Sequence, residues 1–293
     1  GPHCPGLLQH LAESRARYDV VIFFAAIYEP AAVGLPLWGR RSILVPLLHD
    51  EKAMYLPQHH RSFHGAGAIL FNAPAERRLA ARLYGGALGG QPIVGVGVDI
   101  QQPPPATVDA TLARFGLARG YFIYVGRVDP GKGCQVLIDA LRRHWRDDPT
   151  ARLVLVGGAV MALPDDPRII ATGFVDDADR NALIAAATAL VIPSRYESLS
   201  LVLLEAMRLG TPVIANDACE VLADHVALSG AGIAYRGQRG LRHALEQVAA
   251  MGAADRARMT AAGAAYVSSR YTWDAVGAAY EQAIATVCAL PCD

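Results

Sequence analysis

The sequence lacks several features that would assign it to common functional classes. Its 27 basic side chains include only two lysines, Lys52 and Lys132, and 27 acidic side chains bring the formal net charge to zero. This balance argues against a nucleic-acid-binding protein, because affinity for a phosphate backbone needs an excess of positive charge. No apolar run approaches the roughly 20 residues that a membrane-spanning helix needs. The sequence therefore predicts no transmembrane segment.

Cysteine is also scarce, and no recognisable signal peptide begins the sequence. The cysteines are scattered, without the spacing typical of a metal site: Cys4, Cys134, Cys219, Cys288 and Cys292. This usage favours free thiols in a reducing compartment. We therefore expect a cytoplasmic protein, and transient contact with a membrane surface through a local arginine patch stays open.

Short apolar runs alternate with helical patterns along the whole chain. Strands are predicted at residues 20–24, 42–48, 68–71 and 92–96, and then at residues 121–128, 152–156, 169–173, 189–192, 212–215 and 232–235. Such alternation is typical of an α/β protein with parallel sheets between helices. The proline-rich stretch at residues 101–105 interrupts the pattern and is the predicted linker between two domains.

Two glutamates, Glu197 and Glu205, lie across a predicted strand-to-helix junction. The strand ends at Ile192, and a helical pattern follows from Ser200, a capping serine, to a stop at Gly210. Glu197 is therefore expected in the loop and Glu205 in the helix. The free N–H groups of the helix start lie between them and suit an anion. The alternative is that both glutamates are ordinary surface residues, although a carboxylate in a mostly apolar helix needs a partner when buried.

A second polar group follows the strand predicted at residues 121–128. Arg127 and Lys132 flank a glycine-bearing turn at the strand's carboxyl end, which is where ligands bind in open α/β sheets. Because arginine serves almost everywhere else in this chain, the lysine indicates a need for a compact, rotatable charge such as phosphate oxygens prefer. An ordinary surface lysine is the alternative.

Taken in this order, the motifs resemble those of one family. The resemblance is to the nucleotide-sugar-binding half of a retaining, GT-B-fold glycosyltransferase of family 4. It rests on Gly126-Arg127-x₄-Lys132-Gly133, on Glu197-x₇-Glu205 and on the closing Tyr271-Thr272-Trp273. Each motif alone is weak, whereas their order on these elements is more specific.

The resemblance implies a role for each matched position. Arg127 and Lys132 would hold the donor diphosphate and stabilise it as it leaves. Glu197 would hold hydroxyls of the transferred sugar, and Glu205 those of the ribose. The other donor-binding positions it implies, mostly through backbone groups, are Gly126, Gly173, Val175, Ser198, Leu199 and Ser200.

Neither a metal nor a cofactor is expected, with a nucleotide sugar as substrate. Two fixed cations and a helix start would stabilise the departing diphosphate without a metal. Asp177-Ala178-Asp179 matches the Asp-x-Asp of metal-dependent transferases. The triplet opens a helical segment, however, so helix capping is the favoured interpretation.

The resemblance also implies two Rossmann-like domains, the first of them incomplete. We expect an acceptor-side domain at residues 1–102, a donor domain at 103–271 and, at 272–293, a helix that packs back toward the first domain. His49, at the end of a predicted strand, would reach the transferred sugar, or it is simply a satisfied histidine. Four nearby polar residues could line an acceptor site: Lys52, His59, His60 and Arg61. The favoured alternative is that they are ordinary residues of a short polar loop.

The expected function is transfer of a sugar from a UDP- or GDP-sugar to a hydroxyl acceptor, with retention of anomeric configuration. The acceptor would be a sugar or a lipid-linked sugar, in the synthesis of a polysaccharide, lipopolysaccharide or glycolipid. The alternative is a non-catalytic nucleotide-sugar-binding module or partner subunit, which the short first domain favours. A GT-B epimerase or phosphorylase is a third possibility, although a phosphorylase would need a lysine for pyridoxal phosphate.

Overall fold

The computed structural model describes residues 3–144 and 149–291, and the chain divides into two compact units. The smaller unit comprises residues 1–97 and 271–293, and the larger unit residues 98–270. The boundaries between the units therefore lie after Gly97 and after Arg270. The sequence predicted domain boundaries after Gln102 and after Tyr271. Of the five cysteines, Cys292 lies outside the described residues.

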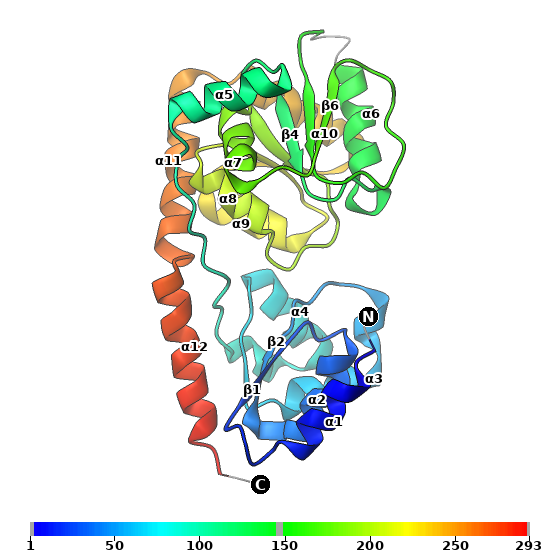
Figure 1. Cartoon of the computed structure of the whole chain (residues 1–293), viewed down its shortest axis with the longest axis vertical. Coiled ribbons are helices and arrows are strands. Elements are labelled where there is room, and N and C mark those ends of the chain that lie inside the picture. The colour runs from blue at the N-terminus through cyan, green and yellow to red at the C-terminus, as the bar shows by residue number, and fades with distance from the viewer. Residues whose placement is uncertain (1–2, 145–148, 292–293) are drawn as a thin grey trace. The chain divides into compact units, whose positions relative to one another are not determined.

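The larger unit is built on a six-stranded parallel sheet in the order β6-β5-β4-β7-β8-β9 (Figure 1). Its strands are β4 (Phe122–Val125), β5 (Leu153–Val156), β6 (Ile169–Gly173), β7 (Ala189–Ile192), β8 (Val213–Asn216) and β9 (Gly232–Tyr235). The six strands predicted here are confirmed. β4 ends three residues earlier than predicted, because the chain turns at Gly126, whose φ is +141°.

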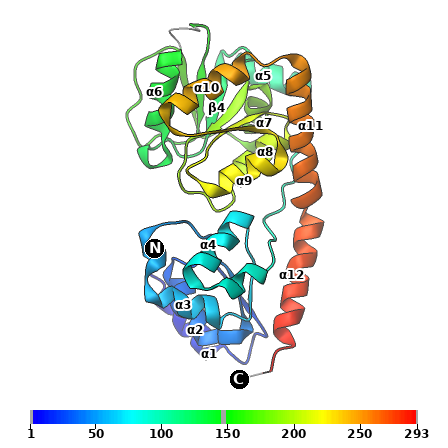
Figure 2. The ribbon, with the colours of Figure 1, turned by 180° about the vertical axis from the view of Figure 1, so that it is seen from behind.

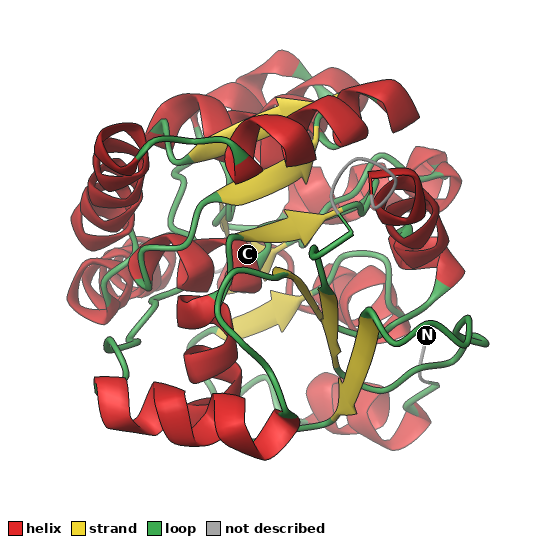
Figure 3. Ribbon diagram, turned by 90° about the horizontal axis from the view of Figure 1, so that it is seen from above, coloured by secondary structure: helices red, strands yellow, loops and turns green. Residues whose placement is uncertain are grey.

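Helices cover both faces of this sheet, as Figure 3 shows with yellow strands between red helices. The helices are α5 (Pro105–Phe115), η4 (Pro130–Lys132), α6 (Cys134–His144), α7 (Asp177–Ala186), α8 (Leu201–Arg208), α9 (Glu220–Ser229), α10 (Gly237–Ala249) and α11 (Ala253–Arg270). α6 and α10 pack together on one face of the sheet, where α10 contacts β8 and β9 (Figure 2). Every residue of β5 and β7 is buried, which explains their uninterrupted apolar sequences.

The predicted linker is shorter than expected. Pro105 is the first residue of α5 and Pro104 is its N-cap residue. Proline is favoured at this helical position, because its fixed φ suits a helix and its missing N–H would have no partner there. The prolines at residues 103–105 therefore lead directly into a helix.

The smaller unit contains a three-stranded parallel sheet in the order β1-β2-β3. Its strands are β1 (Val21–Phe24), β2 (Ser42–Val45) and β3 (Ala68–Ile69), and its helices are α1 (Pro5–Glu13), α2 (Glu29–Trp38), η1 (Gly39–Arg41), η2 (Lys52–Tyr55), α3 (Pro57–Gly65), α4 (Pro74–Tyr84), η3 (Gly86–Gly90) and α12 (Trp273–Cys288). The strand predicted at residues 92–96 is reduced to one bridge between Phe71 and Ile93. β2 ends before Pro46, which lacks an N–H group for the ladder.

The two faces of β2 contribute to two hydrophobic clusters. Ile43 and Val45 pack with α12, which supplies Val276 and Val287. Leu44 points to the opposite face and joins the cluster formed with the helices of that side. The closing helix thus supplies one layer of the smaller unit. Among the described residues, no helix is long and apolar enough to cross a membrane.

The closing Tyr271-Thr272-Trp273 motif packs on the glycines that follow the bridge at Ile93. A Cβ atom on Gly97 would lie 2.4 Å from Cδ2 of Trp273, and one on Gly95 would lie 2.7 Å from Cε1 of Tyr271. Thr272 caps α12 by accepting a hydrogen bond from the N–H of Ala275 at 3.3 Å. These contacts explain why both glycines and all three motif residues occur.

Glu76 ties together the loops that follow β2 and β3. Its two carboxyl oxygens accept hydrogen bonds from the backbone N–H of Leu48 at 2.6 Å and of Asn72 at 2.5 Å. The side chain is buried, and burial raises its pKa to about 8 although backbone hydrogen bonds act to lower it. The loop after β2 carries His49, so this buried carboxyl holds the backbone beside a predicted site residue.

Glu76 should make the stability of the smaller unit depend on pH. The folded protein keeps the proton on Glu76 up to about pH 8, whereas the unfolded chain loses it near pH 4.5. The proton therefore stabilises the fold fully below the unfolded pKa, and this contribution is lost as pH rises toward 8. As the pH rises from 5 to 8, we expect the stability of the wild type to fall relative to that of Glu76→Gln. Hydrogen exchange of the three-stranded sheet measures both stabilities.

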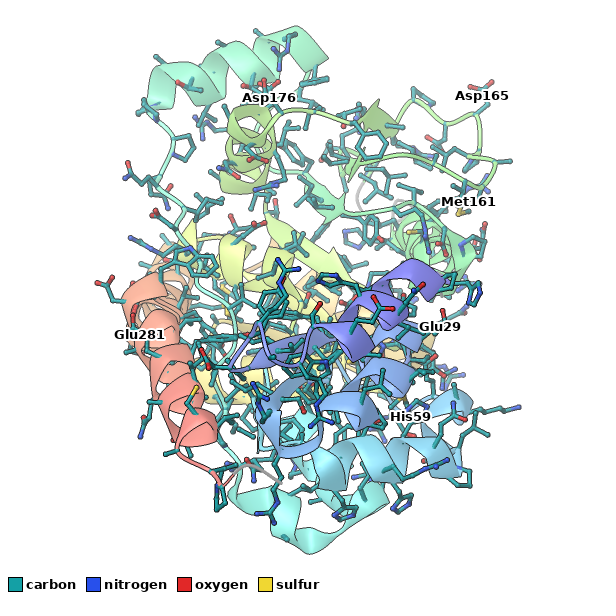
Figure 4. All side chains as sticks on the ribbon, turned by 60° about the horizontal axis from the view of Figure 1, so that its bottom comes forward. Glu29, His59, Met161, Asp165, Asp176 and Glu281 are labelled. Carbon is teal, nitrogen blue, oxygen red and sulfur yellow. The ribbon has the colours of Figure 1, made fainter. Side chains whose placement is uncertain are left out.

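The matched control is Glu281→Gln, at an exposed position on α12 (Figure 4). This variant should follow the wild type throughout the pH range. A constant difference in stability between wild type and Glu76→Gln would contradict the raised pKa of Glu76.

Candidate functional site

The strand order identifies one edge of the larger sheet as the place for a ligand. β4 and β7 are neighbours, but the chain leaves β4 toward β5 on one side and leaves β7 toward β8 on the other. In open parallel sheets, ligands bind outside the carboxyl ends of the strands at such a point. The loops after these two strands, residues 126–133 and 193–200, contain the first motif and Glu197 of the second, whose Glu205 lies on α8.

Asp129 organises the loop after β4. Its Oδ1 accepts a hydrogen bond from the backbone N–H of Lys132 at 3.0 Å, and its Oδ2 accepts one from Nε of Arg127 at 2.6 Å. The hydrogen bond from Arg127 is the main reason that the pKa of Asp129 is lowered. One carboxylate therefore fixes the backbone of one predicted cation and the side chain of the other.

Gly133 brings this loop against the end of β7. Its φ is +80°, and a Cβ atom there would lie 2.8 Å from the carbonyl oxygen of Pro193. No other residue offers both the left-handed conformation without strain and this close approach. The glycine after Lys132 therefore allows the loops of β4 and β7 to touch.

Lys132 and Glu197 meet at this contact. Nζ of Lys132 lies 3.0 Å from Oε1 of Glu197, and the two side chains are 37% and 19% exposed. The residues are 65 positions apart and belong to separate motifs. The structure thus brings together the predicted phosphate-binding cation and the predicted sugar-binding carboxylate, while their roles stay predictions.

The loop after β7 presents backbone N–H groups at the start of α8. Among the described residues, no acceptor bonds the N–H groups of Ser198, Leu199 and Ser200. Ser200 occupies the N-cap position with φ +65°, but its side chain makes no capping hydrogen bond. The serine therefore lies at the predicted N-cap position, but the capping hydrogen bond that was expected of its side chain is not made. These N–H groups are suited to an anion.

His225 of α9 supports this loop from beneath. It is buried and hydrogen bonds to the hydroxyl of Tyr266 at 2.9 Å through Nδ1. Burial lowers its pKa to about 4, although a hydrogen bond with the backbone of Leu199 acts to raise it. A neutral imidazole thus connects α11 with the loop that carries the predicted sugar-binding residues.

Glu205 projects from α8 and pairs with Arg180 of α7. Nη2 of Arg180 lies 3.3 Å from Oε1 of Glu205, and Nη1 lies 2.9 Å from Oδ1 of Asp177. Burial raises the pKa of Glu205, while the positive charge of Arg180 lowers it. The sequence argument required a partner for this glutamate without identifying it.

The positions predicted to face a base lie at the end of β6. Gly173 ends the strand with φ +69°, and its carbonyl oxygen accepts a hydrogen bond from the N–H of Gly157 at 2.8 Å. The next side chain, Phe174, is 89% exposed. Gly173 and Val175 thus lie at the same sheet edge as the two loops, and their contact with a base stays a prediction.

The Asp-x-Asp triplet is accounted for by contacts within the protein. Asp176, labelled in Figure 4, caps α7 by accepting a hydrogen bond from the N–H of Asp179 at 2.8 Å, so the capping residue precedes the triplet. Asp177 pairs with Arg180, and Asp179 pairs with Arg114. In residues 3–144 and 149–291, no group of three or more His, Cys, Asp or Glu side chains is arranged to hold a metal ion.

His49 lies in the smaller unit, in the loop after β2. Its Nδ1 is 3.6 Å from Oε1 of Glu51, and the side chain is half-buried. Leu47, two residues earlier, has φ +49°, and the following N–H is the one that Glu76 binds. The loop is firmly held, and the role of His49 stays a prediction.

One of the four residues expected to line an acceptor site is placed elsewhere. His59 on α3 is buried, and burial lowers its pKa (Figure 4). It therefore belongs to the interior of the smaller unit, and that expectation is wrong. Lys52, His60 and Arg61 are exposed, as the expectation requires.

Comparison with known proteins bears on the loops just described. Residues 119–250, which include both loops, match the family described as Glycosyl transferases group 1. This segment is a group 1 glycosyltransferase domain. The resemblance inferred from the motifs is therefore confirmed.

Curated relatives of this chain carry different names. A D-inositol 3-phosphate glycosyltransferase from Jonesia denitrificans is 32% identical over 231 residues, covering 71% of this chain and 54% of the relative. Glycogen synthase from Mycobacterium tuberculosis is 32% identical over 219 residues, covering 68% and 49%. The chain thus spans about half the length of these curated relatives.

Solved structures agree in fold. Sucrose-phosphate synthase from Thermosynechococcus elongatus has a TM-score of 0.77 at 21% identity, covering 96% of this chain and 78% of that one. Anabaena Alr3699/HepE in complex with UDP and glucose has a TM-score of 0.78 at 19% identity, covering 97% and 82%. The fold of this chain, α/β with two parallel sheets, is therefore of the GT-B type.

Gly133→Ala should weaken the contact between the two loops of the site. The added Cβ would clash with the carbonyl of Pro193 and would occupy a strained left-handed conformation. We expect a loss of roughly 2 to 4 kcal/mol in the free energy of unfolding. The measurement is urea denaturation of the whole chain, in which hydrogen exchange of residues 98–270 reports the unfolding of the larger unit.

Gly230→Ala is the matched control, because Gly230 has φ +63° and nothing within 4 Å of the added Cβ. It should cost only the conformational strain, about 1 kcal/mol. Equal losses in the two variants would show that the contact with Pro193 is unimportant.

Proposed function

We propose that this chain transfers a sugar from a UDP- or GDP-sugar to a hydroxyl acceptor, with retention of anomeric configuration. The observation that carries the proposal is the contact of Lys132 with Glu197 at 3.0 Å, with Arg127 on the same loop. It lies where the strand order reverses, which is where open α/β sheets bind ligands. The related fold of Alr3699/HepE in complex with UDP-glucose supports this choice of donor.

Donor binding exchanges the ion pairs of the ligand-free site. Lys132 pairs with Glu197, and Arg127 pairs with Asp129. A diphosphate carries more negative charge than one carboxylate, so it competes for Lys132 and releases Glu197 to accept hydroxyls of the sugar. The N–H groups of Ser198, Leu199 and Ser200 then meet the phosphate or the sugar.

The same groups stabilise the departing diphosphate. Breaking the glycosidic bond adds negative charge to the phosphate oxygens, where Arg127, Lys132 and the start of α8 provide fixed positive charge. Loss of one such contact costs ~3 kcal/mol, about a hundredfold in rate. We propose that these groups provide the stabilisation without a metal.

The acceptor side belongs to the smaller unit in this proposal. His49 would contact the transferred sugar, and the acceptor would be a sugar or lipid-linked sugar used in a polysaccharide, lipopolysaccharide or glycolipid. A cytoplasmic location and peripheral contact with a membrane surface belong to the same proposal. The relatives named D-inositol 3-phosphate glycosyltransferase and glycogen synthase support a sugar-modifying role without selecting one acceptor.

A non-catalytic nucleotide-sugar-binding module is the second candidate. The residues proposed for the nucleotide and the diphosphate all lie between Gly126 and Glu205, inside the larger unit. His49 is the proposed donor contact from the smaller unit. Measurement of binding and of turnover separates the two candidates.

Lys132→Ala and Glu205→Ala should each weaken binding of a nucleoside diphosphate at least tenfold. Lys132 supplies the positive charge for the phosphates, and Glu205 supplies the acceptor for ribose hydroxyls. Isothermal titration calorimetry with UDP, GDP and ADP measures the effect.

Arg242→Ala is the control, because Arg242 lies on α10 and pairs with Glu246, away from both loops. It should bind like the wild type. Absence of wild-type binding to all three nucleotides would refute the donor site.

Glu197→Ala should abolish donor hydrolysis and sugar transfer while nucleoside diphosphate binding is retained. Glu197 is assigned to the sugar, so its loss removes contacts that a nucleoside diphosphate does not make. The measurement is release of UDP or GDP from the sugar nucleotide, with binding of the free diphosphate followed by calorimetry.

Turnover by the wild type would rule out the pure binding module. Binding of a nucleoside diphosphate by the wild type, without hydrolysis or transfer of any donor sugar, would instead favour that module for this chain.

A further inference from the structure

Arg180 and Glu205 form a partly buried ion pair that the family motif does not include. Arg180 is in the first half of α7 and Glu205 is on α8, 25 residues later, and the nitrogen-to-oxygen distance is 3.3 Å. Their side chains are 27% and 21% exposed. An ion pair shielded to this extent is less screened by solvent than a surface pair.

The guanidinium of Arg180 is fixed by two carboxylates. Nη2 bonds to Glu205, and Nη1 lies 2.9 Å from the exposed Asp177 of the same helix. A planar fork held at two nitrogens has a defined orientation, which a lysine could not provide. The position of Arg180 on α7 therefore sets the orientation in which its guanidinium bonds to Glu205.

One oxygen of Glu205 stays available for a ligand. The pair with Arg180 uses Oε1, and no hydrogen bond to Oε2 is found among the described residues. Glu205 is just over one turn into α8, whose start carries the N–H groups assigned to the phosphate or the sugar. Oε2 is thus the oxygen that can accept a hydroxyl group.

We propose that Arg180 is the positioning residue of Glu205, holding Oε1 so that Oε2 accepts a ribose hydroxyl of the donor. This inference rests on the proposed function, because it assigns Glu205 to the ribose. It adds a residue outside the recognised motifs whose side chain acts through Glu205. Arg180 itself is not assigned a contact with the nucleotide.

The charge of Arg180 has a second effect on the same carboxylate. Burial raises the pKa of Glu205, Arg180 lowers it, and Asp177 of α7 raises it. Without Arg180, burial and Asp177 both favour the protonated form, so the pKa of Glu205 rises further. A protonated carboxyl is a poorer acceptor for a hydroxyl, and ribose recognition is then lost at a higher pH.

The test compares nucleotides with and without a ribose hydroxyl. Calorimetry is performed with UDP, GDP and ADP, and then with the 2′-deoxy and 3′-deoxy forms of the one that binds best. The proteins are wild type, Arg180→Met, Arg180→Lys and Glu205→Gln, from pH 5.5 to 8.5. Arg242→Met is the matched control, because Arg242 pairs with Glu246 on α10 and has no role in the proposed site.

In the wild type, we expect at least one deoxy form to bind roughly tenfold more weakly at pH 7.5, because a hydroxyl contact to a charged group is lost. Arg180→Met should reduce this ratio below about threefold and raise the pH at which it disappears by at least one unit. Arg180→Lys should restore part of the ratio, since it keeps the charge and loses the fork. Arg242→Met should stay within twofold of the wild type. In Glu205→Gln, the ratio should not change with pH.

The outcomes separate this inference from the proposed function. If the wild type discriminates between ribose forms and Arg180→Met discriminates equally well, the positioning role is wrong. The same conclusion follows if Arg180→Met weakens all forms equally at every pH, because a merely structural role predicts that result. If the wild type binds none of the three nucleotides, the proposed function itself fails.

Discussion

The adjacency of β4 and β7 is the constraint on which the candidate site depends. Parallel pairing aligns their carboxyl ends at one edge, while the chain leaves them for opposite sides of the sheet. Two loops from distant parts of the sequence therefore meet without filling the space above the strand ends. Gly133 lets the loops touch at Pro193, and Lys132 reaches Glu197 beside that contact.

The charges of the site are paired before any ligand binds. Asp129 neutralises Arg127, Glu197 neutralises Lys132, and Glu205 is matched by Arg180. Partly buried charges are costly without such partners, so the pairs allow the site to fold when it is empty. They also make binding of an anionic donor an exchange of partners. The proposed ligand thus takes the place of Glu197 at Lys132, while the pair on α8 stays in place.

Sequence reasoning succeeded where a residue's environment follows from its neighbours in the chain. The apolar runs predicted all six strands of the larger sheet, and β5 and β7 are buried throughout, as strands covered on both faces should be. It failed at positions decided by conformation or burial. Ser200 occupies the N-cap position without a capping bond, and His59 is interior although the polar residues around it suggested a surface. Arg180 was missed because the pattern around a helix start does not reveal a partner on another helix.

The sequence by itself determined the α/β class and the two loops that carry the polar motifs, because these depend on periodicity and local spacing. The family was inferred from the resemblance of those motifs to a known family. Only the tertiary structure decided which carboxylate each cation meets. Lys132 and Glu197 are 65 residues apart, and Arg180 and Glu205 are 25 apart, so their distances depend on the order of the strands and the packing of helices. These long-range contacts determine which charged groups become partners, and the spacing of residues along a single sequence does not predict such contacts.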